Sequence, residues 1–235
     1  MIGTQAYVGA ELEIFAHAQQ WKAYYKSIIS PFFGKRVLEV GAGLGSTAES
    51  LCDGTQADWT CLEPDPDLLA QLQARQLPPC CRPQLGFVST LALDSRFDSI
   101  LYIDVLEHIE DDRAELERAS RHLAPGGKLI VLSPAYQFLF SPFDESIGHY
   151  RRYDRASLSA LTPPGCQQVM LRYLDSVGLL TSLANRLFLR QSLPTQAQIL
   201  FWDRRLVPLS RLLDPLVGFR FGRSIIGVWQ KSAQE

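Results

Sequence analysis

The segment FDESIGHYRRYD, residues 143–154, gathers acids, a histidine, two arginines and two tyrosines around a single glycine. A histidine has an unperturbed pKa near neutral, so His149 can accept a proton at physiological pH. The guanidinium groups of Arg151 and Arg152 can bind a carboxylate or phosphate, or they can pair with the acids of the same segment. These residue types fit a loop that faces a substrate, and they also fit an ordinary solvated loop.

A second group of residues with chemical potential is the glycine-rich loop GAGLG, residues 41–45, which directly follows the apolar run VLEV. Glycine lets the backbone turn sharply and approach a ligand closely. The dinucleotide fingerprint G-x-G-x-x-G wants its last small residue at Ser46, so the spacing disfavours NAD. Glu63 follows about twenty residues later, where a carboxylate can accept bonds from both ribose hydroxyls. It can alternatively cap a helix that starts at Asp65.

Both groups of residues depend on elements that place them at one edge of a sheet. Four short apolar runs predict buried strands at residues 36–40, 59–63, 97–104 and 128–134. Helical patterns separate these runs, and strands alternating with helices predict a doubly wound α/β fold. Ligands in such folds bind beyond the carboxyl ends of the strands, which is where both groups follow their strands.

The segments that flank this core have patterns of their own. Apolar residues at helical spacing over residues 11–29 predict a helix that covers the sheet and can act as a lid. Residues 179–190 carry an apolar stripe, and RSIIGVWQK (residues 223–231) predicts one more strand. We therefore expect a single domain over residues 1–235. It divides into an N-terminal cap helix (1–30), a cofactor-binding core (31–135), and a substrate loop with a helical C-terminal elaboration (136–235).

The composition is that of an ordinary globular protein, with 46% hydrophobic and 20% charged residues among 235. The net charge of −2 is unevenly placed: residues 1–166 hold 14 basic and 21 acidic residues, whereas residues 167–235 hold 9 and 4. A basic, apolar segment fits a membrane surface or an anionic ligand, and it also fits a surface that offsets the acidic part.

Cysteine usage and the N-terminal sequence restrict the class of protein further. Five cysteines without CxxC spacing argue against a disulfide framework and against zinc, so we predict no metal site. The N-terminus lacks a basic stretch before an apolar one, and no run of about eighteen apolar residues occurs. These features predict a cytoplasmic protein.

Four motifs occur in order over roughly residues 30–135: VLEVGAGLGSTAESL, CLEPDPDLL, FDSILYIDVLEHIEDD and LAPGGKLIVLSP. As a set they resemble the class I S-adenosylmethionine-dependent methyltransferases. The later segment SPFDESIGHYRRYDRASL resembles, more loosely, a segment of a bacterial subgroup of small methyltransferases. The resemblance implies a Rossmann-like, mostly parallel sheet of seven strands with the last strand antiparallel. It also implies S-adenosyl-L-methionine as cofactor and S-adenosyl-L-homocysteine as product.

The resemblance implies roles at the methionine end of the cofactor. Glu39 stands where an acid orders the glycine loop and approaches the methionine amino group. Gly41 and Gly43 match residues that line the cofactor, and Gly45 serves the turn into the next helix. Asp104 ends the fourth strand, where it faces the methionine moiety.

The resemblance also implies roles at the adenosine end. Glu63 matches the acid that binds the ribose, with Pro64 next to the adenine. Residues after the third strand usually hold the adenine edge, which places Thr90 and Leu91 there. The acid that is common at this position has no clean match, because Asp94 is offset.

Methyl transfer requires that the acceptor be aligned and, for a hydroxyl or an amine, that it lose a proton. We predict His149 as the base and Tyr153 as a second catalytic group. His108 lies either behind the site or at its edge. The predicted substrate-binding residues are Tyr136, Phe140, Asp144, Arg151 and Arg152. Ion pairs among the charged members and loop anchoring by the aromatic ones are the alternative roles.

The sequence therefore predicts a methyltransferase acting on a small-molecule or lipid-like acceptor, as in secondary-metabolite or glycolipid biosynthesis. The leucine-rich C-terminal segment suggests contact with a membrane surface or with a second subunit. Nucleic acid is disfavoured as an acceptor, because the basic residues are diluted among leucines. An NAD-linked oxidoreductase and a catalytically silent binding module are the alternatives.

Overall fold

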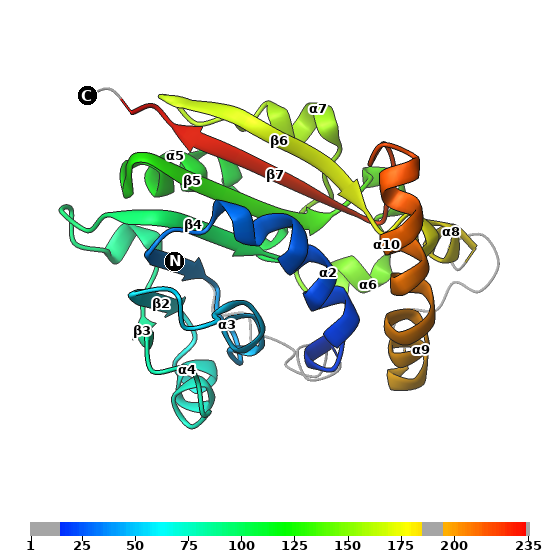
Figure 1. The fold of residues 1–235 in the computed structure, drawn as a ribbon, viewed down its shortest axis with the longest axis horizontal. Helices are drawn as coiled ribbons and strands as arrows, with labels where there is room; N and C mark the ends of the chain where they lie inside the picture. The colour runs from blue at the N-terminus through cyan, green and yellow to red at the C-terminus, as the bar shows by residue number, and fades with distance from the viewer. Residues whose placement is uncertain (1–14, 185–194, 234–235) are drawn as a thin grey trace.

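A computed structural model describes residues 15–184 and 195–233. Its centre is one seven-stranded sheet with the order β3-β2-β1-β4-β5-β7-β6 (Figure 1). The strands are β1 (Arg36–Val40), β2 (Asp58–Glu63), β3 (Cys81–Leu85), β4 (Phe97–Ile103), β5 (Leu123–Pro134), β6 (Cys166–Leu174) and β7 (Ser224–Lys231). Strands β1 to β5 are parallel, whereas β7 runs antiparallel to both β5 and β6. The predicted Rossmann-like sheet with an antiparallel last strand is confirmed.

The central strands are apolar on both faces because helices cover both faces. Successive residues of a strand point to opposite faces, so Val37 and Leu101 join one core while Leu38 and Ile100 join the other. None of these four side chains is exposed. Burial on two sides explains why the predicted strands appear in the sequence as continuous apolar runs.

Helices on the two faces come from different parts of the chain (Figure 1). Residues of α2, α3, α4 and α10 join one core, and residues of α5 and α7 join the other. The helices are α2 (Gln19–Ile29), α3 (Ser46–Leu51), α4 (Pro66–Gln73), α5 (Asp112–Arg121), α6 (Pro142–Ser146), α7 (Arg155–Ser159), α8 (Ser176–Ala184), α9 (Gln196–Phe201) and α10 (Val207–Leu216). Shorter helical turns are η1 (Ser30–Phe32), η2 (Val88–Thr90), η3 (Leu106–His108), η4 (Gln137–Leu139) and η6 (Trp202–Leu206).

The N-terminal helix is shorter than its sequence pattern predicts. The described helix α2 begins at Gln19, after a break at His17 and Ala18, and residues 1–14 of the predicted cap lie outside the described part. The first backbone N–H groups of α2 have no partner within the helix. Asp203 accepts two of them, from Gln20 and Trp21, at 3.2 and 2.8 Å. The start of α2 is therefore determined by a residue far away in the sequence.

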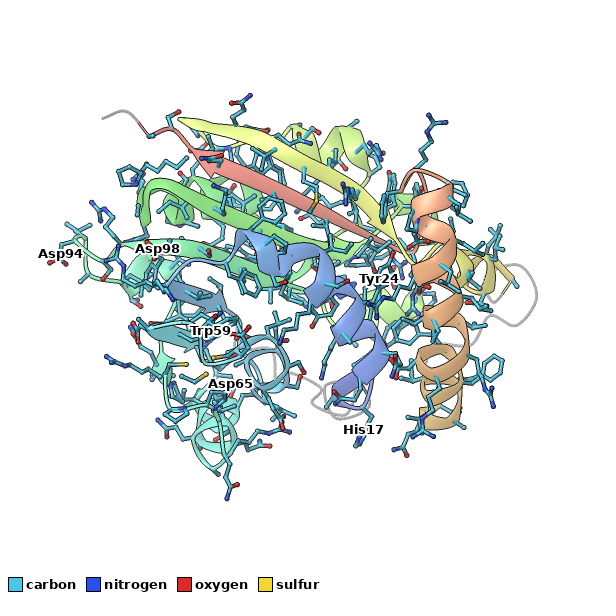
Figure 2. All side chains as sticks on the ribbon, viewed as in Figure 1. His17, Tyr24, Trp59, Asp65, Asp94 and Asp98 are labelled. Carbon is cyan, nitrogen blue, oxygen red and sulfur yellow. The ribbon has the colours of Figure 1, made fainter. Side chains whose placement is uncertain are left out.

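Buried acids attach the C-terminal helices to the rest of the fold. Asp175 accepts hydrogen bonds from the Trp202 indole (2.7 Å) and the Ser210 hydroxyl (2.6 Å). Asp214 accepts from the Tyr24 hydroxyl (2.7 Å) and from the backbone N–H of Asp175 (2.7 Å). Figure 2 labels Tyr24 on α2, on the side that faces α10. These bonds hold α10 against both α2 and the end of β6.

Residues 185–190 of the predicted apolar stripe lie outside the described residues. In the two described ranges, no helix combines the length and the apolar character that crossing a membrane requires.

Candidate active site

The glycine loop joins β1 to α3 at the carboxyl edge of the sheet. Gly41, Gly43 and Gly45 have φ angles of +67°, +53° and +77°, a left-handed conformation that only glycine adopts without strain. A Cβ atom at Gly41 would lie only 2.8 Å from Cγ2 of Val105, which follows β4. The loop therefore presents bare backbone and contacts the turn after β4.

Glu63 holds this loop to the end of β2. Its Oε2 accepts the Gly43 N–H (2.7 Å) and its Oε1 accepts the Asp65 N–H (3.0 Å). Its side chain is buried, and burial raises its pKa. A carboxylate has about four lone-pair positions, so acceptor capacity remains. Asp65 itself caps α4, and Pro64 is exposed beside it, so the capping role considered for Glu63 belongs to Asp65.

Glu39 lies on the face of β1 that α2 and α3 cover. It is 2% exposed, its Oε2 accepts a hydrogen bond from the Trp59 indole at 2.7 Å, and burial raises its pKa to about 8. The predicted role of Glu39 was to order the glycine loop. In the structure its hydrogen-bond partner is instead a tryptophan of the neighbouring strand.

Asp104 stands at the end of β4 in a left-handed conformation, with φ of +54°. Its side chain is exposed at this edge. Desolvation by the surrounding chain nevertheless raises its pKa to about 6, and the positive charge of Arg223 opposes this shift. Burial and Asp104 together raise the pKa of the Tyr25 hydroxyl. Sequence reasoning missed Tyr25 and Arg223 as neighbours of Asp104, because only the tertiary structure brings α2 and the start of β7 to this position.

The residues predicted at the adenine side lie in and after the turn η2, and their adenine roles stay predictions. Thr90 uses its hydroxyl locally, donating to the Phe87 carbonyl at 2.8 Å, and Leu91 is buried. Asp94 lies beside Asp98 at the amino end of β4, away from the site (Figure 2). Phe87, Ser89 and Thr90 are exposed after β3, and Phe87 is the large apolar side chain among them, 52% exposed. Sequence reasoning did not consider Phe87, although a large aromatic residue shortly after a strand was a signal for it.

The loop after α6 brings His149 to this edge in a defined orientation. Its Nδ1 lies 2.9 Å from Oδ1 of Asp144, which is fully buried and also accepts two hydrogen bonds from Arg152 (2.8 and 2.9 Å). Burial alone would raise the pKa of Asp144, but the bonds from His149 and Arg152 outweigh it and hold the pKa well below its usual range. Because an ionised carboxylate only accepts, it places the proton of neutral His149 on Nδ1.

Two residues of the turn η3 meet His149. The rings of His108 and His149 pack edge to face with centroids 4.5 Å apart. Nε2 of His149 lies 3.9 Å from Oε1 of Glu107, whose other oxygen accepts the Ser133 hydroxyl at 3.0 Å. Burial lowers the pKa of His108 to about 3 and raises that of Glu107 well above its usual value. Of the two positions considered for His108, the structure places it beside His149 at the site edge.

Two predicted site residues instead anchor the loop to the start of α5. Tyr153 is 1% exposed, and its hydroxyl donates to Oδ2 of Asp112 at 2.8 Å. Arg151 donates to the same Asp112 oxygen at 2.9 Å and to the Glu110 carbonyl. These bonds leave neither side chain directed at an acceptor, so the catalytic role of Tyr153 and the substrate role of Arg151 are not supported.

The remaining predicted acceptor residues divide in a similar way. Arg152 and Asp144 form the ion pair described above, so they orient His149 rather than bind substrate. Tyr136 is partly buried, has φ of +65° and stacks on Tyr173 with ring centroids 4.8 Å apart. Phe140 is partly buried in the same loop. Pocket-wall roles for Tyr136 and Phe140 stay predictions.

Known proteins match different portions of this chain. Residues 38–129 match the family described as "Methyltransferase domain". The ubiquinone biosynthesis O-methyltransferase of Idiomarina loihiensis is 32% identical over 100 residues, which is 41% of each chain. The norajmaline N-methyltransferase of Rauvolfia serpentina is 30% identical over 118 residues, covering 48% of this chain and 40% of that one. The aligned region thus spans well under half the length of these curated relatives.

Solved structures match over a longer range but at low identity. The partner of the Trm112 methyltransferase activator in a Haloferax volcanii complex has a TM-score of 0.66 at 16% identity, covering 96% of this chain and 95% of that one. At this identity the similarity concerns the fold, and it extends over the C-terminal elaboration as well as the core.

Proposed function

We propose that this chain is an S-adenosylmethionine-dependent methyltransferase that methylates a hydroxyl oxygen of a small, apolar acceptor. The match of residues 38–129 to a methyltransferase domain and the similarity to curated methyltransferases support this proposal. S-adenosylmethionine is the cofactor of these methyltransferases. We therefore set aside the alternative of an NAD-linked oxidoreductase. The choice of oxygen is supported by the relatives that are O-methyltransferases.

The residues at the carboxyl edge fit this cofactor. The glycine loop offers backbone without side chains, and Gly41 cannot carry one because Val105 is too close. Glu63 keeps acceptor capacity for ribose hydroxyls after binding two backbone N–H groups. Exposed Asp104 gives a negative charge for the cationic end of the ligand, and exposed Phe87 gives an apolar surface for its base.

The bound cofactor supplies a methyl group that is already activated by its sulfonium. The chain therefore has to align the acceptor, exclude water and help remove a proton. Alignment alone can contribute several orders of magnitude in rate. A group that assists proton loss contributes about 10²–10⁴-fold more.

We assign proton removal to the cluster around His149, and the observation that carries this assignment is its orientation. Asp144 fixes the Nδ1 proton, so Nε2 faces the end of β4, where Glu107 lies. An imidazole held by a buried carboxylate is a recurrent arrangement for proton transfer. Its side chain is only 8% exposed, so the surroundings also exclude water.

An apolar or lipid-like acceptor is supported by the surface of the C-terminal helices. Large hydrophobic side chains are exposed there at Leu180, Leu183, Phe201, Leu209, Leu212, Leu213, Leu216 and Phe221. Exposed apolar patches of this kind mark interaction sites. The acids of the described C-terminal part, Asp175, Asp203 and Asp214, are all buried, whereas Arg204, Arg205, Arg211 and Arg220 are exposed. We propose that this surface contacts an anionic membrane, from which the acceptor is taken.

The first experiment is calorimetric titration of the pure protein with S-adenosylmethionine, S-adenosylhomocysteine and NAD. We expect micromolar binding of the first two and none of NAD, with Glu63→Gln as the variant that weakens binding about 10–100-fold. The loaded protein is then assayed for S-adenosylhomocysteine formation with phenolic acceptors, with and without an alkyl tail, and with amine analogues. Turnover on amines alone would overturn the oxygen assignment, and failure to bind the cofactor would overturn the function.

A further inference from the structure

Three potential ligand atoms converge at the end of β4. The donor atoms of Glu107, His108 and His149 all lie within 4.8 Å of one another. Glu107 and His108 come from the turn after β4, whereas His149 comes from the loop after α6. Neither metal-binding spacing nor a shared motif links these positions, so only the fold brings them together.

The carboxylate of Glu107 is incompletely satisfied in the structure. Its side chain is fully buried, Oε2 accepts the Ser133 hydroxyl, and Oε1 has no hydrogen-bond partner. A buried polar atom without a partner costs about 1–3 kcal/mol, more when it is charged. Nε2 of His149 lies 3.9 Å from Oε1, which is too long for a hydrogen bond.

That distance suits two atoms that share a cation. Bonds of about 2.0–2.2 Å from a metal to nitrogen and oxygen allow their two ligand atoms to lie up to roughly 4.3 Å apart. The spacing of 3.9 Å between Oε1 and Nε2 falls inside this limit. Two imidazoles and one carboxylate form a donor set that first-row transition metals use, with further positions open.

The groups behind these atoms are also those of a metal site. Metal-binding histidines usually donate their other ring N–H to a carboxylate, as His149 does to Asp144. The His108 ring packs edge to face against the His149 ring, which helps to orient both rings. Asp104 is exposed at the same edge and acts electrostatically on Glu107, which leaves an acidic approach from solvent.

We propose that Glu107, His108 and His149 bind a divalent first-row transition metal ion next to the acceptor position. This departs from the expectation of no metal, which rested on cysteine spacing. This metal site deepens the proposed function and rests on it, because the ion would act by stabilising negative charge on the acceptor oxygen. The cluster around His149 would then assist proton removal through the ion, which lowers the pKa of the acceptor hydroxyl, and the released proton passes to water.

The balance of the transfer is simple. The acceptor O–H bond breaks and its proton is released, and the oxygen forms a new bond to the methyl carbon. The carbon–sulfur bond breaks with its electron pair on sulfur, which turns the sulfonium into a neutral thioether. No oxidant, reductant or further reactant is needed.

The test uses metal binding by the full chain, without cofactor or acceptor. Protein freed of metal with a chelator is titrated with Co²⁺, and visible absorption reports the coordination. We expect one ion per chain, with binding weakened at least about 100-fold in His149→Ala and at least about 10-fold in Glu107→Gln. His17→Ala is the matched control, because His17 is exposed at the break before α2. Circular dichroism checks that each variant is folded.

Three results would overturn the proposal. The first is no Co²⁺ binding by a chain that binds S-adenosylmethionine. The second is Co²⁺ binding that both site variants leave intact. The third is binding lost in Cys80→Ser, because the donor atoms of Cys52, Cys80 and Cys81 also lie within 4.8 Å of one another and form the competing site. Metal binding without any binding of S-adenosylmethionine would instead overturn the proposed function and leave this site standing.

Discussion

The two halves of the carboxyl edge are built in different ways. On the β1–β2 side, residues close in sequence to their strands form the site: a glycine loop and Glu63 bind each other through one 2.7 Å hydrogen bond. On the β4–β5 side, Glu107, Ser133 and the pair Asp144 and His149 come from three separate segments. The first half uses backbone shape, and the second uses a network of buried charged and polar side chains in which Oε1 of Glu107 lacks a hydrogen-bond partner among the described residues.

This difference separates two tasks. A backbone loop that accepts no side chain suits a ligand of constant shape, such as a cofactor. A network of buried charged and polar groups can orient one reactive side chain, but each member depends on the others. Damage to the first half should therefore affect cofactor affinity, and damage to the second should affect turnover.

The largest effect is expected from His149→Ala. Loss of this group, whether it takes the proton or binds an ion, should lower kcat by about 10²–10⁴-fold. The Kd of S-adenosylmethionine should stay within about twofold, because His149 lies on the acceptor side. Single-turnover kinetics and calorimetry measure the two quantities, with His17→Ala as control. A rise in Kd as large as the fall in kcat would contradict the division of tasks between the two halves.

The converse variant is Glu63→Gln. It keeps the shape of the side chain but removes the charge that accepts the Gly43 and Asp65 N–H groups. A hydrogen bond to a charged group contributes about 1.5–3 kcal/mol, so the Kd of S-adenosylmethionine should rise about 10–100-fold. At saturating cofactor kcat should be nearly unchanged. A fall in kcat at saturation would show that the halves are coupled.

A smaller effect is expected on the C-terminal surface. Leu212 and Leu216 of α10 are 69% and 81% exposed. Replacing both by Glu should weaken sedimentation with phosphatidylglycerol vesicles about 10-fold or more, through lost apolar contact and charge repulsion. Leu93→Glu is the matched control, because Leu93 is 91% exposed next to Asp94 at the opposite edge (Figure 2). Unchanged vesicle binding with altered sedimentation velocity would assign this surface to a second copy of the chain.

The smallest effect concerns stability and pH. Burial raises the pKa of Glu39 from 4.5 to about 8, so the folded state keeps a proton that the unfolded state loses. Stability should therefore fall as the pH rises from about 4.5 to about 8, and Glu39→Gln should remove about 1–3 kcal/mol of that fall. Thermal melts of both proteins at pH 5 and pH 8, without cofactor, measure this. Parallel pH profiles would show that Glu39 is not the group responsible.

Much of the core could be read from local sequence. Strands β1, β2 and β4 lie within one residue of the apolar runs that predicted them. The helix caps at Asp65 and Asp111 are also local, since each side chain bonds N–H groups two or three residues ahead. The boundaries of strands and helices are harder to predict where local sequence signals conflict. Strand β5 begins at Leu123, because the APGG segment continues as extended strand rather than as a helix stop.

By itself, the sequence determined the central strands, the helices between them and the glycine loop, because period, caps and turns act over a few residues. It assigned the ordering of that loop to Glu39, whereas in the structure Glu63 accepts the Gly43 N–H. Only the tertiary structure decided which of the charged residues at 143–154 face the site. Arg151 and Tyr153 bond to Asp112, and Arg152 bonds to Asp144, which leaves His149 directed at Glu107. The physical reason is burial: a charge removed from water must find a partner, and those partners lie on strands and helices that only the folded sheet brings together.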